Sequence, residues 1–265
     1  MSYENFLVEK SDGIATVTLN RPEALNAMSR RMREELLDLA LGMRGDRETR
    51  FVIFTGAGRA FSAGADVKEM RDLPGEEPPP PEKARLGQFL GHDLARTVEN
   101  MEQITIAAVN GLALGAGMGL CMLCDFRVLS EKAYFGIPEA AVGLFYTWGC
   151  TPRLVRLVGP AWAKDLIMTC RNVDAEEAMR IGLAHRVVAP ERLMEEACSL
   201  ARHIRKMPPL VTRLTKKLVN AASAPQIGDI FITESELVER INLSPDRQEA
   251  VNSFLEKREP KYTGL

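Results

Sequence analysis

The sequence predicts an α/β fold in which strands and helices alternate before the chain becomes mostly helical. Residues 51–55 and 104–109 are short apolar runs of the kind that forms buried strands. Beyond Pro152 apolar residues recur mainly at helical spacing. We therefore expect an α/β core at 1–200 and a helical region at 201–265, whose apolar faces would serve self-association.

Composition narrows the class of protein. With 265 residues, of which 46% are hydrophobic and 26% charged, the chain can bury a sizeable core. A net charge of −2 gives no overall attraction to nucleic acid or to an anionic membrane. The N-terminus lacks a signal-peptide pattern, and no apolar run reaches the roughly 18 residues of a membrane span. We expect a cytoplasmic protein.

The five cysteines form an odd set in apolar surroundings, which favours reduced core thiols over a disulfide framework. Cys121 and Cys124 have the spacing of a redox or metal pair. They lie in an apolar segment, however, and the chain has no second pair. No metal or redox cofactor is implied.

The first elements follow from turns and caps. Strands at 3–10 and 14–19 flank Ser11-Asp12-Gly13 and predict a hairpin. After a polar loop, Ser29 is expected to cap a helix that runs to about Met43. The proline-rich stretch 74–82 predicts a loop, either a surface insertion or a lid over the site. A helix should follow over 82–101.

The most informative stretch is 104–139. It predicts a strand, a glycine-rich turn that opens a helix, a second strand at 125–129 and an aromatic turn that ends at Glu139. Glycine is costly in a helix, so we expect something to approach this backbone closely. The third position of a dinucleotide fingerprint is Leu120 or Met122 instead of glycine, and the Gly-Lys-Ser/Thr of a P-loop is absent.

The remaining use of such a turn is an oxyanion hole, because unpaired N–H groups stand at the positive end of a helix. A second donor is needed, and residues 61–70 supply a candidate after the strand at 51–55. Residues 142–149 are aromatic and belong either to an acyl pocket wall or to the core. His92 is expected at the surface, and His185 in a structural or edge role.

The remaining elements are predicted from periodicity, with one short strand at 185–188 among helices. The helices are expected at 161–169, 175–181, 191–206, 209–222, 226–242 and 246–257.

Several separated motifs resemble the enoyl-CoA hydratase/isomerase (crotonase) superfamily, and the likeness covers nearly the whole chain. The motifs are LNRP…LNA at 19–27, AFSAGADVKEM at 60–70, AVNG…LGAG at 108–117, CDFR at 124–127 and FGIPE at 135–139. The resemblance implies a crotonase-type spiral of ββα units with a helical C-terminal oligomerisation region. It also implies a homotrimer or a dimer of trimers, and an acyl-CoA thioester as the substrate. Coenzyme A would then be part of the substrate and no separate cofactor is expected.

The resemblance also implies site residues. The backbone N–H groups of Ala65 and Ala116 would form the oxyanion hole, with Ala116 where relatives usually have glycine. The segments that line the coenzyme A groove in relatives match Ala24, Ala65, Asp66, Val67 and Lys68. Lys257 matches a C-terminal lysine that reaches a phosphate on a neighbouring subunit.

The chain departs from the hydratase pattern at Gly119. Hydratases of the family carry two glutamates, of which Glu139 matches the second and Gly119 stands in place of the first. A single acid/base group favours double-bond isomerisation, in which Glu139 moves a proton from C2 to C4 of a 3-enoyl-CoA. Two alternatives stay open. One is hydration of an unusual dienoyl or cyclic acyl-CoA, and the other is a non-catalytic homologue that binds coenzyme A or RNA through the cations at 202–217.

Overall fold

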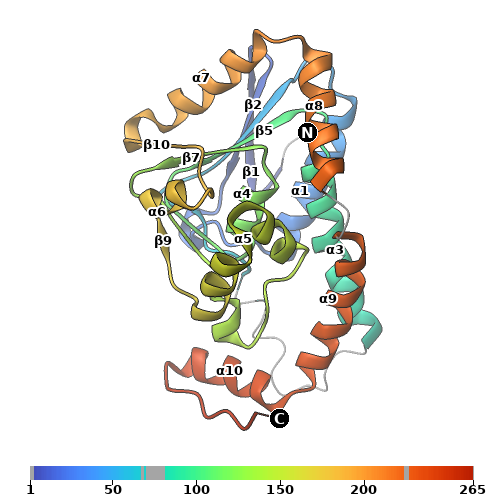
Figure 1. Cartoon of the computed structure of the whole chain (residues 1–265), viewed down its shortest axis with the longest axis vertical. Coiled ribbons are helices and arrows are strands. Elements are labelled where there is room, and N and C mark those ends of the chain that lie inside the picture. The colour runs from blue at the N-terminus through green and yellow to red at the C-terminus, as the bar shows by residue number, and fades with distance from the viewer. Residues whose placement is uncertain (1–2, 67–68, 70–80, 224–226, 265) are drawn as a thin grey trace.

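The structure, a computed structural model, describes residues 3–66, 69, 81–223 and 227–264, with the backbone alone for 81–88 and 227–233. Within these residues ten strands form two sheets, which helices cover (Figure 1). The strands are β1 (Phe6–Ser11), β2 (Ile14–Leu19), β3 (Phe51–Gly56), β4 (Ala60–Ser62), β5 (Ile104–Val109), β6 (Leu112–Leu114), β7 (Phe126–Ser130), β8 (Tyr134–Gly136), β9 (Val173–Asp174) and β10 (Arg186–Val188). The helices of the α/β part are α1 (Arg30–Gly42), α3 (Pro81–Glu99), α4 (Ala116–Leu123), α5 (Cys150–Thr169) and α6 (Ala175–Arg180). They are followed by α7 (Leu193–Arg205), α8 (Pro209–Ser223), α9 (Ile227–Asn242) and α10 (Pro245–Glu256).

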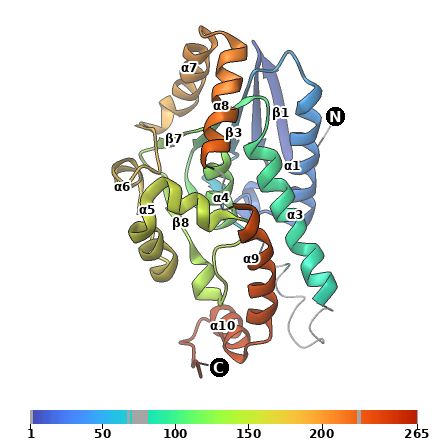
Figure 2. The ribbon, with the colours of Figure 1, turned by 45° about the vertical axis from the view of Figure 1, so that its right-hand side comes forward.

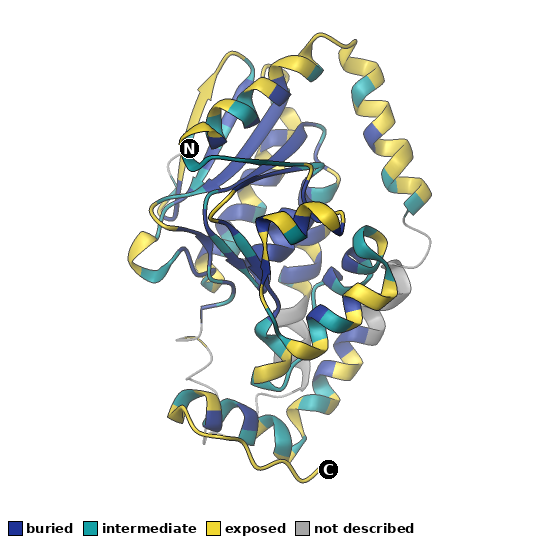
Figure 3. Cartoon of the chain, turned by 60° about the vertical axis from the view of Figure 1, so that its left-hand side comes forward, coloured by how far each residue is buried: buried dark blue, intermediate teal, exposed yellow. Residues whose placement is uncertain are grey.

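The larger sheet has the order β1-β2-β3-β5-β7-β10, in which β1 and β2 form the expected hairpin and the other pairs are parallel. Its central strands are buried on both faces. Along β3, Val52 and Phe54 join the core beneath α1 and α3, while Phe51 and Ile53 pack with α7 on the other face. This alternation is the period of two that a strand imposes. It explains why every residue of β5, and every residue of β3 except Gly56, is buried (Figure 3).

The smaller sheet, in the order β4-β6-β8-β9, was not expected from the sequence. Its strands have two or three residues each, which is too short for a periodic pattern to reveal them. The sequence predicted that a glycine-rich turn joins the strand at 104–109 directly to the helix. In the structure, β6 lies within that stretch. Because β4, β6 and β8 are parallel, their carboxyl ends lie at one edge, and the chain segments that follow them meet there.

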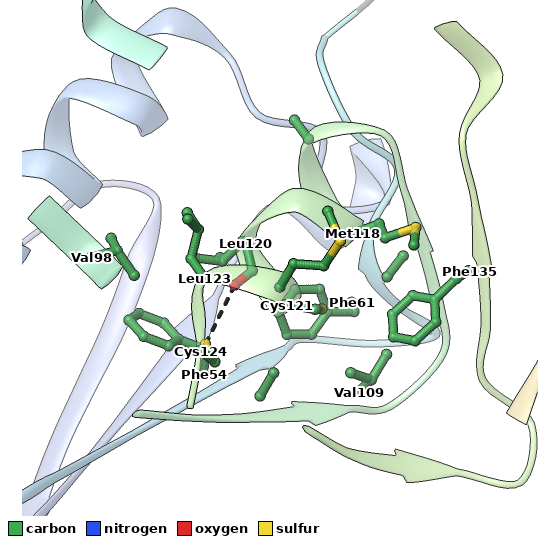
Figure 4. Packing of buried hydrophobic residues seen from close by; sticks show 14 of the residues in the cluster. Phe54, Phe61, Val98, Val109, Met118, Leu120, Cys121, Leu123, Cys124 and Phe135 are labelled. Atoms are coloured by element: carbon green, nitrogen blue, oxygen red, sulfur yellow. Dashed lines mark hydrogen bonds between the residues drawn. The ribbon is translucent and has the colours of Figure 1, made fainter. Parts of the chain in front are cut away.

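Helix α4 is buried at every residue and forms the centre of the core (Figure 4). Cys121 lies among Phe61 and Phe135, and the Cys124 thiol is 3.4 Å from the Leu120 carbonyl oxygen. Burial raises the pKa of Cys124 to about 12. All five cysteines are free, as expected, and this pair belongs to the core.

The start of α1 and the loop before α3 were both predicted from the sequence. Ser29 accepts a hydrogen bond from the Met32 N–H, which confirms it as the cap of α1. The loop expected at 74–82 lies largely outside the described residues, but its end was predicted wrongly. Residues 81 and 82, which the prediction assigned to the loop, belong to helix α3.

The C-terminal helices extend the molecule in two directions (Figures 1 and 2). The expected division between residues 200 and 201 falls inside α7, which packs on the larger sheet. Helix α9 packs against α3, and α10 packs against the short 3-10 helix η3 (Pro138–Val142). Helix α10 therefore lies against the element that carries Glu139. Among the described helices, none has the length and apolar character needed to cross a membrane.

Candidate active site

The two segments predicted as oxyanion donors meet at the edge of the smaller sheet. Gly115 follows β6 with φ of 46°, a conformation open to glycine, and Ala116 begins α4. Gly64 follows β4 with φ of 91°, and a Cβ added to it would lie 2.8 Å from the Leu114 carbonyl oxygen and 3.6 Å from the Ala116 nitrogen. Both glycines therefore permit a backbone approach that a side chain would block.

The backbone N–H groups of Ala65 and Ala116 are not needed for the hydrogen bonds that hold their own segments in place. Met28 pairs with Ala65 as a parallel bridge, through hydrogen bonds from the Met28 N–H to the Gly64 oxygen and from the Asp66 N–H to the Met28 oxygen. Successive N–H groups of an extended chain point to opposite sides, so the Ala65 N–H faces away from Met28. As the first residue of α4, Ala116 has an N–H that needs no partner within the helix.

The loop at 20–28 holds this arrangement in place. The Asn26 side chain donates to the carbonyl oxygens of Ala57 and Ala60, and it accepts from the Arg21 N–H. Ser62 donates to the Asn26 carbonyl oxygen at 2.8 Å. The Arg21 guanidinium also pairs with the Asp66 carboxylate at 3.0 Å. In the sequence Asn26 is only part of a motif, and its hydrogen bonds to three segments could not be predicted from it.

Glu139 projects from η3, after β8, toward the turn that follows β6. A Cβ added to Gly115 would lie 2.4 Å from Glu139 Oε1, so the carboxylate lies directly against the turn that precedes Ala116. The residue is partly exposed as a whole, yet Oε2 is buried and has no hydrogen-bond partner among the described residues. Burial raises the pKa of Glu139 to about 7, which suits a group that both accepts and returns a proton near neutral pH.

The space beside Gly119 is filled by other side chains. A Cβ at this position would lie 2.9 Å from Cys150 Sγ and 3.6 Å from the Tyr146 hydroxyl oxygen. A longer side chain at 119 would have to displace one or both. Glu139 is thus the carboxylate that the described structure places against the Gly115 turn, and a side chain at 119 would require Cys150 to shift.

Tyr146 and Trp148, from the aromatic stretch, have different surroundings. Tyr146 is buried and donates a hydrogen bond to the Gly115 carbonyl oxygen at 3.0 Å. Trp148 is partly buried against the core, and the Arg33 guanidinium lies 5.2 Å from its ring centroid. The aromatic character of the stretch suggested a wall or core, but gave no signal that a hydroxyl reaches the glycine turn.

Of the other predicted ligand contacts, the structure describes Ala24 and Lys257. Ala24 is half-buried in a 3-10 turn at Pro22–Ala24. Lys257 is exposed at the end of α10. Val67 and Lys68 lie outside the described residues. The coenzyme A groove expected from these residues therefore stays a prediction.

His92 and His185 both contact other side chains or backbone groups of the fold. His92, expected at the surface, is buried on α3, and its Nε2 lies 3.2 Å from Glu234 Oε2 on α9. This expectation was wrong because the partner comes from a helix far along the chain. His185 lies just before the edge strand β10, and its Nδ1 accepts from the Arg127 N–H. Burial, with Arg127 and Arg186 nearby, lowers the pKa of His185 to about 4, so it stays neutral.

The basic cluster at 202–217 is largely engaged with carboxylates. Lys216 is buried and pairs with Asp125 at 2.8 Å, and Lys217 pairs with Glu102. Arg205 pairs with Asp12. Among the described residues, no three His, Cys, Asp or Glu side chains are grouped so that they could hold a metal ion.

Comparison with known proteins identifies the family. Residues 9–264 match the family described as Enoyl-CoA hydratase/isomerase. The chain belongs to this family. It is an α/β protein of the crotonase fold and an enzyme of the hydratase/isomerase class.

Individual relatives extend over nearly the full length of the chain. It is 38% identical to the crotonyl-CoA hydratase of Syntrophomonas wolfei, with 99% of each chain covered. It is 40% identical to the short-chain-enoyl-CoA hydratase of Clostridium acetobutylicum, with 97% of each covered. An enoyl-CoA hydratase structure from Mycobacterium avium subsp. paratuberculosis aligns with a TM-score of 0.86 at 25% identity, covering 99% of this chain and 100% of that one.

Proposed function

We propose that this enzyme isomerises the double bond of an enoyl-CoA, with Glu139 as its single acid/base group. The observation that carries the proposal is that the Glu139 carboxylate lies against the Gly115 turn with Oε2 buried and without a partner among the described residues, while position 119 has no side chain to supply a second carboxylate. Hydration needs a water to be held and activated. Isomerisation requires only that one group remove a proton and return it to another carbon.

The proposed reaction begins with a 3-enoyl-CoA whose thioester oxygen accepts hydrogen bonds from the Ala65 and Ala116 N–H groups. Glu139 removes a proton from C2, and the negative charge of the resulting dienolate develops on that oxygen. Each donor of such a hole is worth on the order of 3 kcal/mol in the transition state. Glu139 then delivers a proton to C4, and the double bond moves into conjugation with the thioester.

The test supplies a 3-enoyl-CoA and a 2-enoyl-CoA of the same chain length and follows the absorbance of the conjugated thioester. We expect the absorbance to rise with the 3-enoyl substrate and to stay constant with the 2-enoyl substrate. Glu139→Gln should abolish the rise. A wild-type rate in Glu139→Gln would remove Glu139 from the mechanism.

Hydration is the second candidate, and the names of the relatives favour it. The proteins that are 38% and 40% identical are named crotonyl-CoA hydratase and short-chain-enoyl-CoA hydratase. A fall in absorbance with the 2-enoyl substrate would support hydration by Glu139 alone. A dienoyl or cyclic substrate is tested in the same way when both simple substrates fail to react.

We also propose that the enzyme works as a homotrimer or a dimer of trimers. Helix α8 carries a row of exposed apolar side chains at helical spacing, which is costly to leave in water. These are Leu210, Val211, Leu214, Leu218 and Val219. Sedimentation velocity should report an oligomer, and Leu214→Glu together with Leu218→Glu should dissociate it. A monomeric wild-type protein would contradict the proposal.

A further inference from the structure

A buried hydroxyl lies behind the glycine turn that presents Ala116. Tyr146 is 2% exposed, and its hydroxyl donates to the Gly115 carbonyl oxygen at 3.0 Å. The same oxygen accepts the Gly119 N–H at 2.9 Å. The Gly115 carbonyl is therefore held by two donors, of which one belongs to a side chain from a separate part of the chain.

That carbonyl and the Ala116 N–H belong to one peptide unit. The unit is planar and trans, so its oxygen and its N–H point in opposite directions. A donor on the oxygen fixes the plane of the peptide and with it the direction of the N–H. It also draws electron density toward the oxygen, which makes the N–H a stronger donor, as in chains of hydrogen bonds.

Residue 119, whose N–H binds the same carbonyl, also lies next to the hydroxyl. A Cβ at 119 would lie 3.6 Å from the Tyr146 oxygen, an ordinary contact, and 2.9 Å from Cys150 Sγ, which would have to shift. A side chain at 119 would therefore be added next to the Tyr146 hydroxyl and the Cys150 thiol.

We propose that Tyr146 is a positioning residue for the oxyanion hole, whose hydrogen bond to the Gly115 carbonyl orients and polarises the Ala116 N–H. It does not need to touch the substrate. This inference rests on the proposed function, because it gives the Ala116 N–H the task of binding the thioester oxygen. It adds a side chain to a hole otherwise built from backbone.

The test measures the hole directly. Wild-type protein and Tyr146→Phe are each saturated with hexanoyl-CoA labelled with ¹³C at the thioester carbon, and the infrared carbonyl stretch is recorded. Phenylalanine keeps the ring and removes only the hydroxyl. We expect the bound wild-type carbonyl to absorb at a lower frequency than free hexanoyl-CoA, and Tyr146→Phe to lose a large part of that shift.

Turnover gives a second readout. With a 3-enoyl-CoA, Tyr146→Phe should lower kcat about 10-fold, less than the 10²- to 10³-fold typical of deleting a whole donor, while KM changes about twofold at most. Tyr134→Phe is the matched control. Tyr134 is a half-buried residue of β8 whose hydroxyl has no hydrogen bond among the described residues, and its variant should behave as wild type.

The outcomes separate the two proposals. An unshifted carbonyl in the wild-type protein would contradict the oxyanion hole itself. A shifted carbonyl that is identical in wild type and Tyr146→Phe would overturn the role of Tyr146, whatever happens to kcat. If Tyr146→Phe does not fold, a difluorotyrosine placed at 146 provides the test. Its more acidic hydroxyl should enlarge the wild-type shift, and an unchanged shift would again overturn the proposal.

Discussion

Two glutamates of this protein have buried carboxylate oxygens in opposite environments. Glu35, on α1, accepts hydrogen bonds from the Glu4 and Asn5 N–H groups and from the Asn5 side chain, and it pairs with Arg31. Burial alone would raise the pKa of Glu35, but these partners outweigh it and lower the pKa. Glu139 has Oε2 buried without a partner among the described residues, and its pKa is raised to about 7.

The difference separates a carboxylate that is held by partners in the fold from the one that we propose as the acid/base group. A satisfied carboxylate contributes to stability and has no reason to exchange protons near neutral pH. An unsatisfied one costs stability and is retained where a reaction needs it. We therefore expect substitution of the two residues to have opposite effects on activity, on stability and on the pH dependence of stability.

The largest expected effect is on activity. Glu139→Gln should lower kcat/KM for the 3-enoyl-CoA by 10²- to 10⁴-fold, the usual contribution of a positioned acid/base group. Glu35→Gln should stay within about twofold of wild type at a temperature where it is folded. Steady-state kinetics on the two variants provides the comparison. An equal loss in both would mean that the Glu139 effect is structural.

The next largest effect is on stability, where the Glu35 variant should lose more than the Glu139 variant. Glu35→Gln places an amide donor opposite backbone and side-chain donors, which should lower the free energy of unfolding by about 1–3 kcal/mol. Urea unfolding at pH 7 measures this. Glu139→Gln should not be destabilised in the same experiment, and a loss of stability there would show that Glu139 has a partner in the fold.

The contributions of Glu139 and Glu35 to the free energy of unfolding should change with pH in opposite directions. Because the pKa of Glu139 rises from 4.5 to about 7 on folding, its contribution is most favourable below pH 4.5 and is lost as the pH rises to 7. At pH 8 Glu139→Gln should therefore be more stable than wild type by up to about 3 kcal/mol, with little difference at pH 4.5. Unfolding curves at the two pH values measure this, and a constant difference would contradict the raised pKa.

Glu35 should behave in the opposite way. Its pKa is lowered on folding, so its contribution is present above pH 4.5 and disappears as the pH falls through the folded value. The stability deficit of Glu35→Gln should shrink under acid conditions.

The smallest effect concerns the helix that carries Glu35. Ser29→Ala removes the side-chain cap of α1 and should cost about 1 kcal/mol. Activity should be unchanged, because the site at the edge of the smaller sheet keeps its contacts. Thermal unfolding checks the loss, and Ser29→Asp, which retains a capping oxygen, should recover most of it.

Sequence alone predicted much of this fold. Periodicity located the strands at 14–19, 51–55 and 104–109, and the serine cap located the start of α1, because these signals are local. The smaller sheet was missed because strands of two or three residues carry no period. The burial of His92 was missed because its partner, Glu234, lies 142 residues away.

The candidate site was predictable in part. Glycine density and the position of Glu139 after an aromatic turn indicated a backbone hole with a carboxylate near it. The contact of Tyr146 with Gly115, and the filling of the space at 119 by Cys150, depend on how separate segments pack. Neither the residue types nor their spacing in the sequence predicts such contacts.

The most direct test of Glu139 as the acid/base group is proton exchange at C2 of a saturated acyl-CoA. Hexanoyl-CoA is incubated in D₂O with wild-type protein, Glu139→Gln or Glu35→Gln, and mass spectrometry follows deuterium uptake. We predict uptake with wild type and Glu35→Gln, and a rate at least about 100-fold lower with Glu139→Gln. Equal uptake by wild type and Glu139→Gln would contradict the assignment of Glu139 as the base.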